Sequence, residues 1–436
     1  MPDFFSYRGG ALYCEDVPAQ AVAEKLGTPL YLYSKAAFLN RLREIREAFA
    51  ATNPAICYSV KANSNLALLK LVAQQGEGFD IVSGGELYRV LKAGGSPGKT
   101  VYAGVGKTAQ EIRYALENDI WMFNVESESE LDDIARLARE MKKIGRVALR
   151  VNPGVAADTH HHLTTGKKEN KFGLDPAVAE TLAKRAAGMK SIQLVGLHAH
   201  IGSQITDTLP HRLTFERLNE FARLLEKRRL SIEYINIGGG FGIRYRDEKT
   251  PPAKEFAAAI EPLVKASGKK LILEPGRYIV GNAAILLTRV VRVKSVPNGK
   301  TFVICDAGMN DLIRPALYDA FHFIWPVKAE APTFLGPAVA GAPQSLSKVD
   351  VVGPVCESGD YFAKHRPLPQ VREGDLLAIF SAGAYGMTMS SNYNARPRAA
   401  EALVDGASLA TIRSRETCAD LTAREENGSA PPRKPL

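Results

Sequence analysis

The sequence predicts an α/β protein in which a (β/α)8 TIM-type barrel is followed by an all-β domain of sandwich or barrel type. Three observations support this class. Apolar, strand-like runs alternate with helical periodicity, eight such runs precede residue 282, and later runs are separated by turn signals instead of helices. A chain of 436 residues, 45% of them hydrophobic, is long enough for the two cores of a soluble two-domain enzyme.

The eight runs predicted as barrel strands are separated by stretches with helix-start signals. Ser127 to Glu130 precede an apolar-striped run that extends to Lys143, and Pro176 opens a run from Ala177 to Ala187. The strand-like runs are Ala55 to Val60, Gly78 to Val82, Thr100 to Ala103, Ile120 to Val125, Val147 to Val151, Gln193 to His200, Ile232 to Ile237 and Lys270 to Glu274. Eight βα units favour a closed barrel over an open doubly wound sheet.

The second predicted domain is read from strands bounded by turn residues, such as Pro297 to Gly299. The strand-like runs are Ala283 to Val293, Thr301 to Cys305, Lys348 to Val355 and Asp375 to Phe380. The run Ala407 to Arg415 is compatible with a helix, and the polar, proline-containing end of the chain predicts a disordered tail.

Composition narrows the class of function. The net charge of +9 comes from Lys and Arg spread along the chain, which favours small anionic ligands over nucleic acid. Five cysteines lack the paired spacing of metal sites, and an odd number argues against a disulfide framework, so we expect a reducing cytoplasm. No apolar run approaches about 18 residues, and the first residues are acidic and aromatic, so we expect neither export nor a membrane partner.

Barrel enzymes place their functional groups at the C-terminal ends of the strands. The first run ends in Lys61, the sixth in His198 to Gln204, the seventh in Gly238 to Gly242 and the eighth in Glu274 to Arg277. An amine, an imidazole, a glycine loop, an acid and a guanidinium group should therefore face one mouth.

Lys61 is the candidate chemical centre. A lysine amine at the mouth of a buried strand, where desolvation favours its neutral form, can bond covalently to a carbonyl carbon. The alternative is a strand-end lysine that extends into solvent.

The glycine loop Gly238 to Gly242 directly follows the seventh strand, where backbone N–H groups can approach a phosphate. A triple glycine also fits a tight turn, and its spacing differs from that of a dinucleotide-binding loop, so no NAD site is expected. His198 and His200 share one face of a strand without a third ligand cluster, and His160 to His162 lie in a polar, loop-like stretch, so we expect no metal site.

A reactive lysine, a phosphate loop and an acid at one mouth together indicate pyridoxal 5'-phosphate. From Gly27 to Asp405 the chain resembles the diaminopimelate decarboxylases, in the alanine-racemase-like class of barrel enzymes that also contains the ornithine and arginine decarboxylases. The resemblance rests on Tyr58 to Asn63, Asn170 to Gly173, His198 to Gln204, Gly238 to Gly242, Glu274 to Arg277, Arg314 to Tyr318 and Cys356 to Asp360.

The resemblance implies that Lys61 bonds to the cofactor aldehyde, that His200 stacks on the pyridine ring and that Glu274 faces the pyridine nitrogen. An acid there keeps the nitrogen protonated, which favours decarboxylation over racemisation. The remaining cofactor contacts that the resemblance implies are made by Ser203, Gly239, Gly240, Gly276, Arg277 and Tyr385.

The implied substrate site combines cations and an acid. A substrate whose far end carries both a carboxylate and an amine needs an arginine and an acid together. Arg277, Arg314 and Glu357 offer such a set, with Tyr318 and Tyr385 as hydroxyl donors. Meso-2,6-diaminopimelate fits, whereas ornithine ends in a bare amine and has no use for Arg314. The alternatives are a decarboxylase of another basic amino acid and a non-catalytic homologue that binds pyridoxal phosphate.

Cys356 is implied to give a proton to the carbanion after carbon dioxide leaves. In the family that the chain resembles, this block reaches the active site of the neighbouring subunit, which implies a homodimer with shared sites. The expected domains are an N-terminal segment joining the β domain (1–34), the cofactor-binding barrel (35–281), the C-terminal β domain (282–415) and a disordered tail (416–436).

Overall fold

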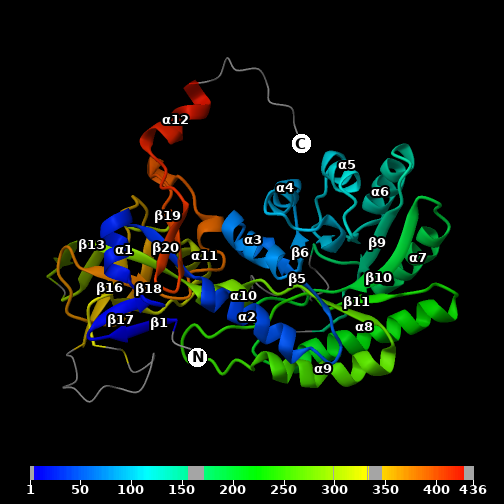
Figure 1. Ribbon diagram of the computed structural model, residues 1–436, viewed down its shortest axis with the longest axis horizontal. Coiled ribbons are helices and arrows are strands. Elements are labelled where there is room, and N and C mark those ends of the chain that lie inside the picture. Colours follow the sequence, from blue (N-terminus) through cyan, green and yellow to red (C-terminus); the bar gives the residue numbers. More distant parts are fainter. Residues whose placement is uncertain (1–3, 156–170, 298, 331, 333–345, 427–436) are drawn as a thin grey trace. The chain divides into compact units, whose positions relative to one another are not determined.

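The structure is a computed structural model that describes residues 4–155, 171–297, 299–330, 332 and 346–426. It divides into two compact units (Figure 1). Among the described residues, the barrel unit contains Leu42–Ile243 and Lys249–Tyr278. The β unit contains the residues up to Arg41, Arg244–Glu248 and those from Ile279 to Glu426. Asn298, in the predicted turn from Pro297 to Gly299, lies outside the described residues, and so does the whole predicted loop at His160 to His162.

The barrel unit is built on eight parallel strands that close in the order β10-β11-β12-β5-β6-β7-β8-β9. The strands are β5 (Ala55–Ser59), β6 (Gly78–Ile81), β7 (Thr100–Tyr102), β8 (Met122–Val125), β9 (Gly145–Arg150), β10 (Ile192–His198), β11 (Tyr234–Asn236) and β12 (Lys270–Leu273). Each of the eight predicted runs overlaps one of these strands, so the barrel predicted from the alternation is confirmed.

Helices surround the strands of this unit (Figure 1). They are α3 (Leu66–Gln74), α4 (Gly84–Lys92), α5 (Ala109–Glu117), α6 (Glu128–Glu140), α7 (Pro176–Ala187), α8 (Leu209–Lys227) and α9 (Ala253–Ser267), while α2 (Lys35–Ala48) and α10 (Arg277–Val280) span unit boundaries. The predicted start signals are confirmed, because the Ser127 side chain accepts the N–H of Glu130 and Pro176 occupies the first turn of α7. No helix within the described ranges is long and apolar enough to cross a membrane.

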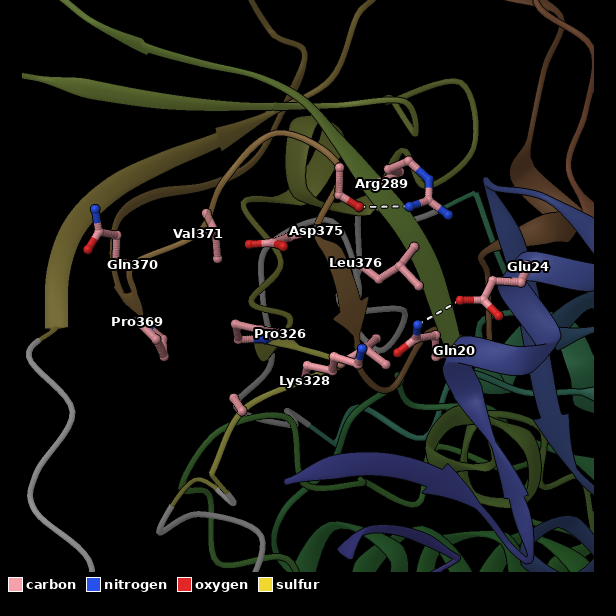
Figure 2. Close-up of a pocket in the computed structure, with 13 residues that line it drawn as sticks. Gln20, Glu24, Arg289, Pro326, Lys328, Pro369, Gln370, Val371, Asp375 and Leu376 are labelled. Atoms are coloured by element: carbon pink, nitrogen blue, oxygen red, sulfur yellow. Dashed lines mark hydrogen bonds between the residues drawn. The ribbon is translucent and has the colours of Figure 1, made fainter. Parts of the chain in front are cut away.

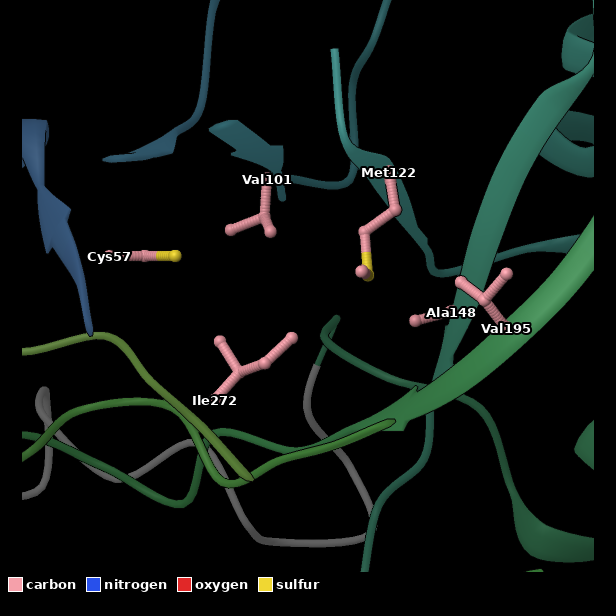
Figure 3. Close-up of a cluster of buried hydrophobic side chains, with 6 residues drawn as sticks. All are labelled: Cys57, Val101, Met122, Ala148, Val195 and Ile272. Atoms are coloured by element: carbon pink, nitrogen blue, oxygen red, sulfur yellow. The ribbon is translucent and has the colours of Figure 1, made fainter. Parts of the chain in front are cut away.

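The interior of the barrel changes from apolar to polar along the strands. Six side chains from six strands form one buried cluster, shown in Figure 3: Cys57, Val101, Met122, Ala148, Val195 and Ile272. Side chains two residues apart on a strand point to the same side. Two residues beyond Cys57, Met122, Ala148 and Ile272 are Ser59, Asn124, Arg150 and Glu274, which are all buried. Apolar side chains therefore fill the barrel interior at the level of this cluster, and the buried polar side chains lie beyond it, toward the C-terminal ends of the strands.

The β unit contains a nine-stranded sheet in which β13 (Ala284–Ser295) pairs with three other strands. The further strands are β4 (Leu30–Ser34), β14 (Thr301–Cys305), β15 (Ile324–Pro326), β16 (Leu346–Val352), β17 (Tyr361–Pro369), β18 (Leu376–Ile379), β19 (Ala400–Asp405) and β20 (Ser408–Arg413). Since β4 pairs with β13 and β19, the N-terminal segment joins this sheet as the resemblance implied. A separate three-stranded sheet of β1 (Phe5–Arg8), β2 (Ala11–Cys14) and β3 (Val17–Pro18) precedes α1 (Ala19–Leu26).

Two expectations near the C-terminus differ from the structure. The helix considered for Ala407 to Arg415 is wrong, because β20 runs antiparallel to β19 there. The missed signal is Gly406, whose positive φ of 61° allows the two-residue loop between paired Asp405 and Ser408. In the segment expected to be disordered, Cys418–Glu426 forms α12, which Thr417 and Asp420 cap through reciprocal hydrogen bonds.

Candidate active site

Lys61 lies in the short 3-10 helix η1 (Val60–Ala62) that directly follows β5, at the mouth of the barrel. Its Nζ donates a hydrogen bond to Asp80 Oδ2 at 2.5 Å, and the Ser59 hydroxyl donates to the same oxygen at 2.7 Å. Asp80 is fully buried near the end of β6. Lys61 is therefore held by a carboxylate that was absent from the predicted set, although an acid inside a strand flanked by apolar residues was a visible signal.

The surroundings of Asp80 have opposing effects on the pKa of its carboxyl group. Burial and the negative charge of Glu274 raise its pKa, whereas the Lys61 amine and the Ser59 hydroxyl lower it. Its other oxygen, Oδ1, has no hydrogen-bond partner among the described residues. The Lys61 amine is therefore the cation that stabilises Asp80, and the two groups depend on each other for their charge and place.

Replacing Asp80 with asparagine should lower kcat by about tenfold, because the lysine loses one charge-assisted hydrogen bond that fixes its amine. Steady-state kinetics measures the effect. The matched control is Asp133→Asn, which removes an exposed ion pair with Arg136 on α6 and should leave kcat unchanged. Equal kinetics for the Asp80→Asn variant and the wild type would contradict a positioning role for Asp80.

Glu274 follows β12 and is the centre of a buried polar cluster. Its Oε1 accepts hydrogen bonds from Asn236 Nδ2 at 2.6 Å and Asn124 Nδ2 at 3.3 Å, and its Oε2 lies 3.2 Å from His198 Nε2. Burial raises the pKa of Glu274, but His198, Lys61 and Asn236 outweigh burial and hold the pKa well below its ordinary value. The site thus presents an ionised carboxylate inside the barrel.

His198 and His200, the pair considered as metal ligands, have different surroundings. His198 contacts Glu274, and Gly239 N–H donates to His200 Nδ1 at 3.4 Å. Burial, with help from the charges of Lys61 and Arg150, lowers the pKa of His200 well below its ordinary value. Across the described ranges no group of three or more His, Cys, Asp or Glu side chains could hold a metal ion.

Glycine is required at several positions of the barrel mouth because neighbouring atoms leave no room for a Cβ. A Cβ on Gly239 would lie 2.1 Å from the Glu274 carbonyl oxygen, and one on Gly240 would lie 2.5 Å from the Gly202 carbonyl oxygen. Gly240 also has a φ of 92°, a conformation that other residues rarely adopt. A Cβ on Gly276 would lie 2.9 Å from Ser59 Cβ. At these three positions a Cβ would collide with a neighbouring carbonyl oxygen or side chain, so only glycine fits the close packing of the loops.

Arg277 and Ser203 come together beside this loop. Arg277 is buried, and its Nε and Nη2 donate to the Ser203 hydroxyl oxygen at 3.2 and 3.1 Å. The barrel unit therefore contains all the predicted residues from the strand ends: Lys61, His200, Ser203, Gly239, Gly240, Glu274, Gly276 and Arg277.

The other predicted residues belong to the β unit. Arg314 begins α11 (Arg314–Tyr318) and is buried, with its Nη1 2.8 Å from His322 Nε2 and its guanidinium carbon 4.8 Å from the centre of the Tyr245 ring. It is therefore no ordinary surface arginine. Tyr318 ends the same helix, and Tyr385 is half-buried with a positive φ of 55°.

Cys356 and Glu357 lie exposed on a loop of the β unit that Asp360 fixes. The Asp360 carboxylate accepts backbone N–H groups from Met309 at 2.7 Å and from Val355 at 2.6 Å. The N–H of Cys356 itself donates to Asn394 Oδ1 at 2.7 Å. The thiol is thus presented to solvent on a loop whose backbone is held from both sides.

A hollow of about 260 Å³ in the β unit lies apart from these residues (Figure 2). Arg289, Lys328 and Asp375 are among its lining residues, and Arg289 donates to the Gly374 carbonyl oxygen at 2.7 Å. None of the predicted site residues lines it. The volume of a cavity is therefore not enough to identify the functional site of this protein.

The mouth of the barrel fits pyridoxal phosphate on three counts. Lys61 offers an amine for the aldehyde, and Glu274 offers a buried anion for a protonated ring nitrogen. Arg277, buried beside the Ser203 hydroxyl, offers a guanidinium group for the phosphate. These are the chemical groups that this cofactor requires.

Comparison with known proteins gives the same class. The model of the family "Pyridoxal-dependent decarboxylase, pyridoxal binding domain" matches residues 35–281. The diaminopimelate decarboxylase of Neisseria meningitidis serogroup A is 47% identical over 414 residues, 95% of this chain and 98% of that protein, and that of Pseudomonas aeruginosa is 47% identical over 423 residues, 97% and 99% of the two chains. The solved structure of diaminopimelate decarboxylase from Helicobacter pylori with L-lysine has a TM-score of 0.87 and 38% identity, covering 94% of this chain and 99% of that chain.

Proposed function

The chain belongs to the diaminopimelate decarboxylase family of pyridoxal-dependent decarboxylases, and we propose that it converts meso-2,6-diaminopimelate to L-lysine and carbon dioxide, the last step of lysine biosynthesis. The family resemblance predicted from the sequence blocks is confirmed, and the cofactor is pyridoxal 5'-phosphate. The observation that carries the proposal is the placement of Lys61 and the ionised Glu274 at the mouth of one barrel. When bound, the cofactor accepts the electron pair that a departing carboxylate leaves behind.

We assign the residues of the barrel unit to holding that cofactor. Lys61 bonds to its aldehyde, with Asp80 keeping the lysine in place, and His200 packs on the ring. In the barrel unit the phosphate is held by Ser203, Gly240 and Gly276, with Gly239 and Arg277 as further cofactor contacts. The family resemblance assigns Tyr385 as a cofactor ligand as well. Support comes from the Gly240 N–H, which has no acceptor among the described residues, and from the Arg277–Ser203 contact.

Glu274 is proposed to keep the ring nitrogen protonated, so its charge acts mainly in the transition state. Glu274→Gln should lower kcat by about a hundredfold with a small change in KM, because one strong charged contact is lost there. The exposed Glu255→Gln on α9 is the matched control and should behave as wild type. An unchanged kcat for Glu274→Gln would exclude this role.

The substrate is proposed to be held at its far end by Arg277, Arg314 and Glu357, with Tyr318 and Tyr385 as hydroxyl donors. Burial of Arg314 against His322 and Tyr245 supports this assignment, because a buried, ordered guanidinium group is suited to bind a carboxylate. A substrate with a bare terminal amine would gain nothing from Arg314.

The working unit is proposed to be a cytoplasmic homodimer with shared active sites. Cys356 of one chain would protonate the carbanion formed in the site that contains Lys61 of the other chain. The exposure of Cys356 and Glu357 on a braced loop supports a role toward another chain. The cysteines within the described ranges are free, which agrees with a reducing compartment.

A comparison of substrates tests the proposed function. Purified protein with pyridoxal 5'-phosphate should release carbon dioxide from meso-diaminopimelate and form L-lysine in equal amount. Ornithine, arginine and lysine, assayed in parallel, should give kcat/KM values at least about a hundredfold lower, because each lacks the distal carboxylate that needs Arg314. A preference for ornithine or arginine would overturn the substrate, and absence of turnover with any of the four would overturn the activity.

A further inference from the structure

His211 lies on α8 directly behind the glycine loop and is fully buried. Its Nε2 is 2.8 Å from the carbonyl oxygen of Gly239. Its ring stacks on Phe241 at a centroid distance of 4.9 Å and meets the ring of Phe256 edge-on at 5.1 Å. The imidazole is thus clamped between aromatic rings with one nitrogen directed at the loop.

The protonation of His211 follows from its surroundings. Burial lowers its pKa to about 4, so the ring is neutral near pH 7. A carbonyl oxygen can only accept a hydrogen bond, so the single ring proton is on Nε2. The other nitrogen, Nδ1, is buried without a partner among the described residues, which agrees with an unprotonated atom. His211 is therefore a fixed donor to Gly239.

The hydrogen bond from His211 determines the direction of the next N–H group in the loop. The Gly239 carbonyl and the Gly240 N–H belong to one trans peptide, in which the two groups point in opposite directions. With the carbonyl toward His211, the Gly240 N–H points to the other side of the loop. In the described part of the chain no acceptor takes that N–H.

The neighbouring carbonyls are fixed by backbone groups. The Gly238 carbonyl accepts the N–H of Glu274 at 2.8 Å, and the Gly240 carbonyl accepts the N–H of Ile205 at 2.8 Å. Between them, the Gly239 carbonyl depends on a side chain, His211, for its hydrogen bond. Of these three carbonyls, the Gly239 carbonyl is therefore the one whose orientation a side-chain substitution can release.

We propose that His211 is a positioning residue that aims the Gly240 N–H at the cofactor phosphate by holding the Gly239 carbonyl on the opposite side of the loop. The inference rests on the proposed role of Gly240 in phosphate binding. Without the donor, the Gly239 carbonyl would be buried and unsatisfied, which favours a rotated peptide. A hydrogen bond to the carbonyl also polarises the peptide and strengthens its N–H as a donor.

The test separates the phosphate from the rest of the cofactor. Holoenzyme is equilibrated by dialysis against graded concentrations of pyridoxal 5'-phosphate, or of pyridoxal, which lacks the phosphate. His211→Phe keeps an aromatic ring between Phe241 and Phe256 but has no N–H donor. Its dissociation constant for pyridoxal 5'-phosphate should rise about tenfold, while that for pyridoxal stays at the wild-type value. His211→Gln, which can still donate an N–H to Gly239, should recover most of the affinity.

Two results would overturn the inference: equal weakening for both ligands, which indicates only disturbed packing, or no weakening for either. Should His211→Phe fail to fold, His211→Met gives the same comparison with a flexible apolar side chain that also lacks a donor. Failure of the wild type to bind pyridoxal 5'-phosphate would instead contradict the proposed function, so the two failures are distinguishable.

Discussion

Replacing Lys61 with alanine should reduce carbon dioxide release from meso-diaminopimelate by about a thousandfold or more, since the amine proposed to bond to the cofactor is lost. The visible absorbance of the bound cofactor should change at the same time. Lys61 is placed at the mouth of the barrel by η1 and by its hydrogen bond to Asp80. Carbon dioxide release and the absorbance spectrum measure the two effects.

The matched control for this variant is Lys70→Ala. Lys70 is exposed on α3, close to Lys61 in the sequence, and it should be replaceable without loss of rate or absorbance. A Lys61→Ala protein that retains the wild-type rate and spectrum would show that another amine binds the cofactor.

Mixing two inactive variants should restore about a quarter of the wild-type activity if the sites are shared. Lys61→Ala and Cys356→Ala homodimers each lack one group in every site, so both should be severely impaired. In a heterodimer one site lacks both groups and the other has both. Because random reassortment makes half of the dimers mixed, and each mixed dimer has one complete site of two, a quarter of the sites work.

The measurement is denaturation, mixing, refolding and assay of carbon dioxide release, with differently tagged chains to demonstrate exchange of subunits. The control is Cys418→Ala, which changes an exposed cysteine on α12 and should retain full activity by itself. No recovery in a mixture with demonstrated exchange would mean that Cys356 serves the Lys61 of its own chain, and the shared site would be wrong.

Most of the barrel could be predicted because its signals are local. Each buried strand is a short apolar run between helices with their own start signals, and the ends of those runs locate Lys61 and Glu274. The same local rules failed at Ala407 to Arg415. There, pairing with β19 and the turn at Gly406 decide the conformation, and helix compatibility does not.

Asp80 and His211 act through another residue, and local sequence patterns could not predict their roles. Asp80 becomes part of the site only because β6 lies next to β5 in the closed barrel, and His211 only because α8 packs behind the glycine loop. Neither residue carries a motif, since its partner is distant in the sequence. Conversely, roles for Arg314 and Cys356 came from family resemblance, because nothing in their local pattern indicates a site.

In the proposed site, Lys61 is the residue to which the cofactor bonds. Borohydride reduction of the holoenzyme makes the bond between the cofactor and the lysine amine permanent. Mass spectrometry of the digested protein then identifies the lysine that carries the cofactor. The added mass should be found on the peptide that contains residue 61, at a stoichiometry approaching one per chain. Cofactor mass on a peptide with a different lysine, and none on Lys61, would contradict the account.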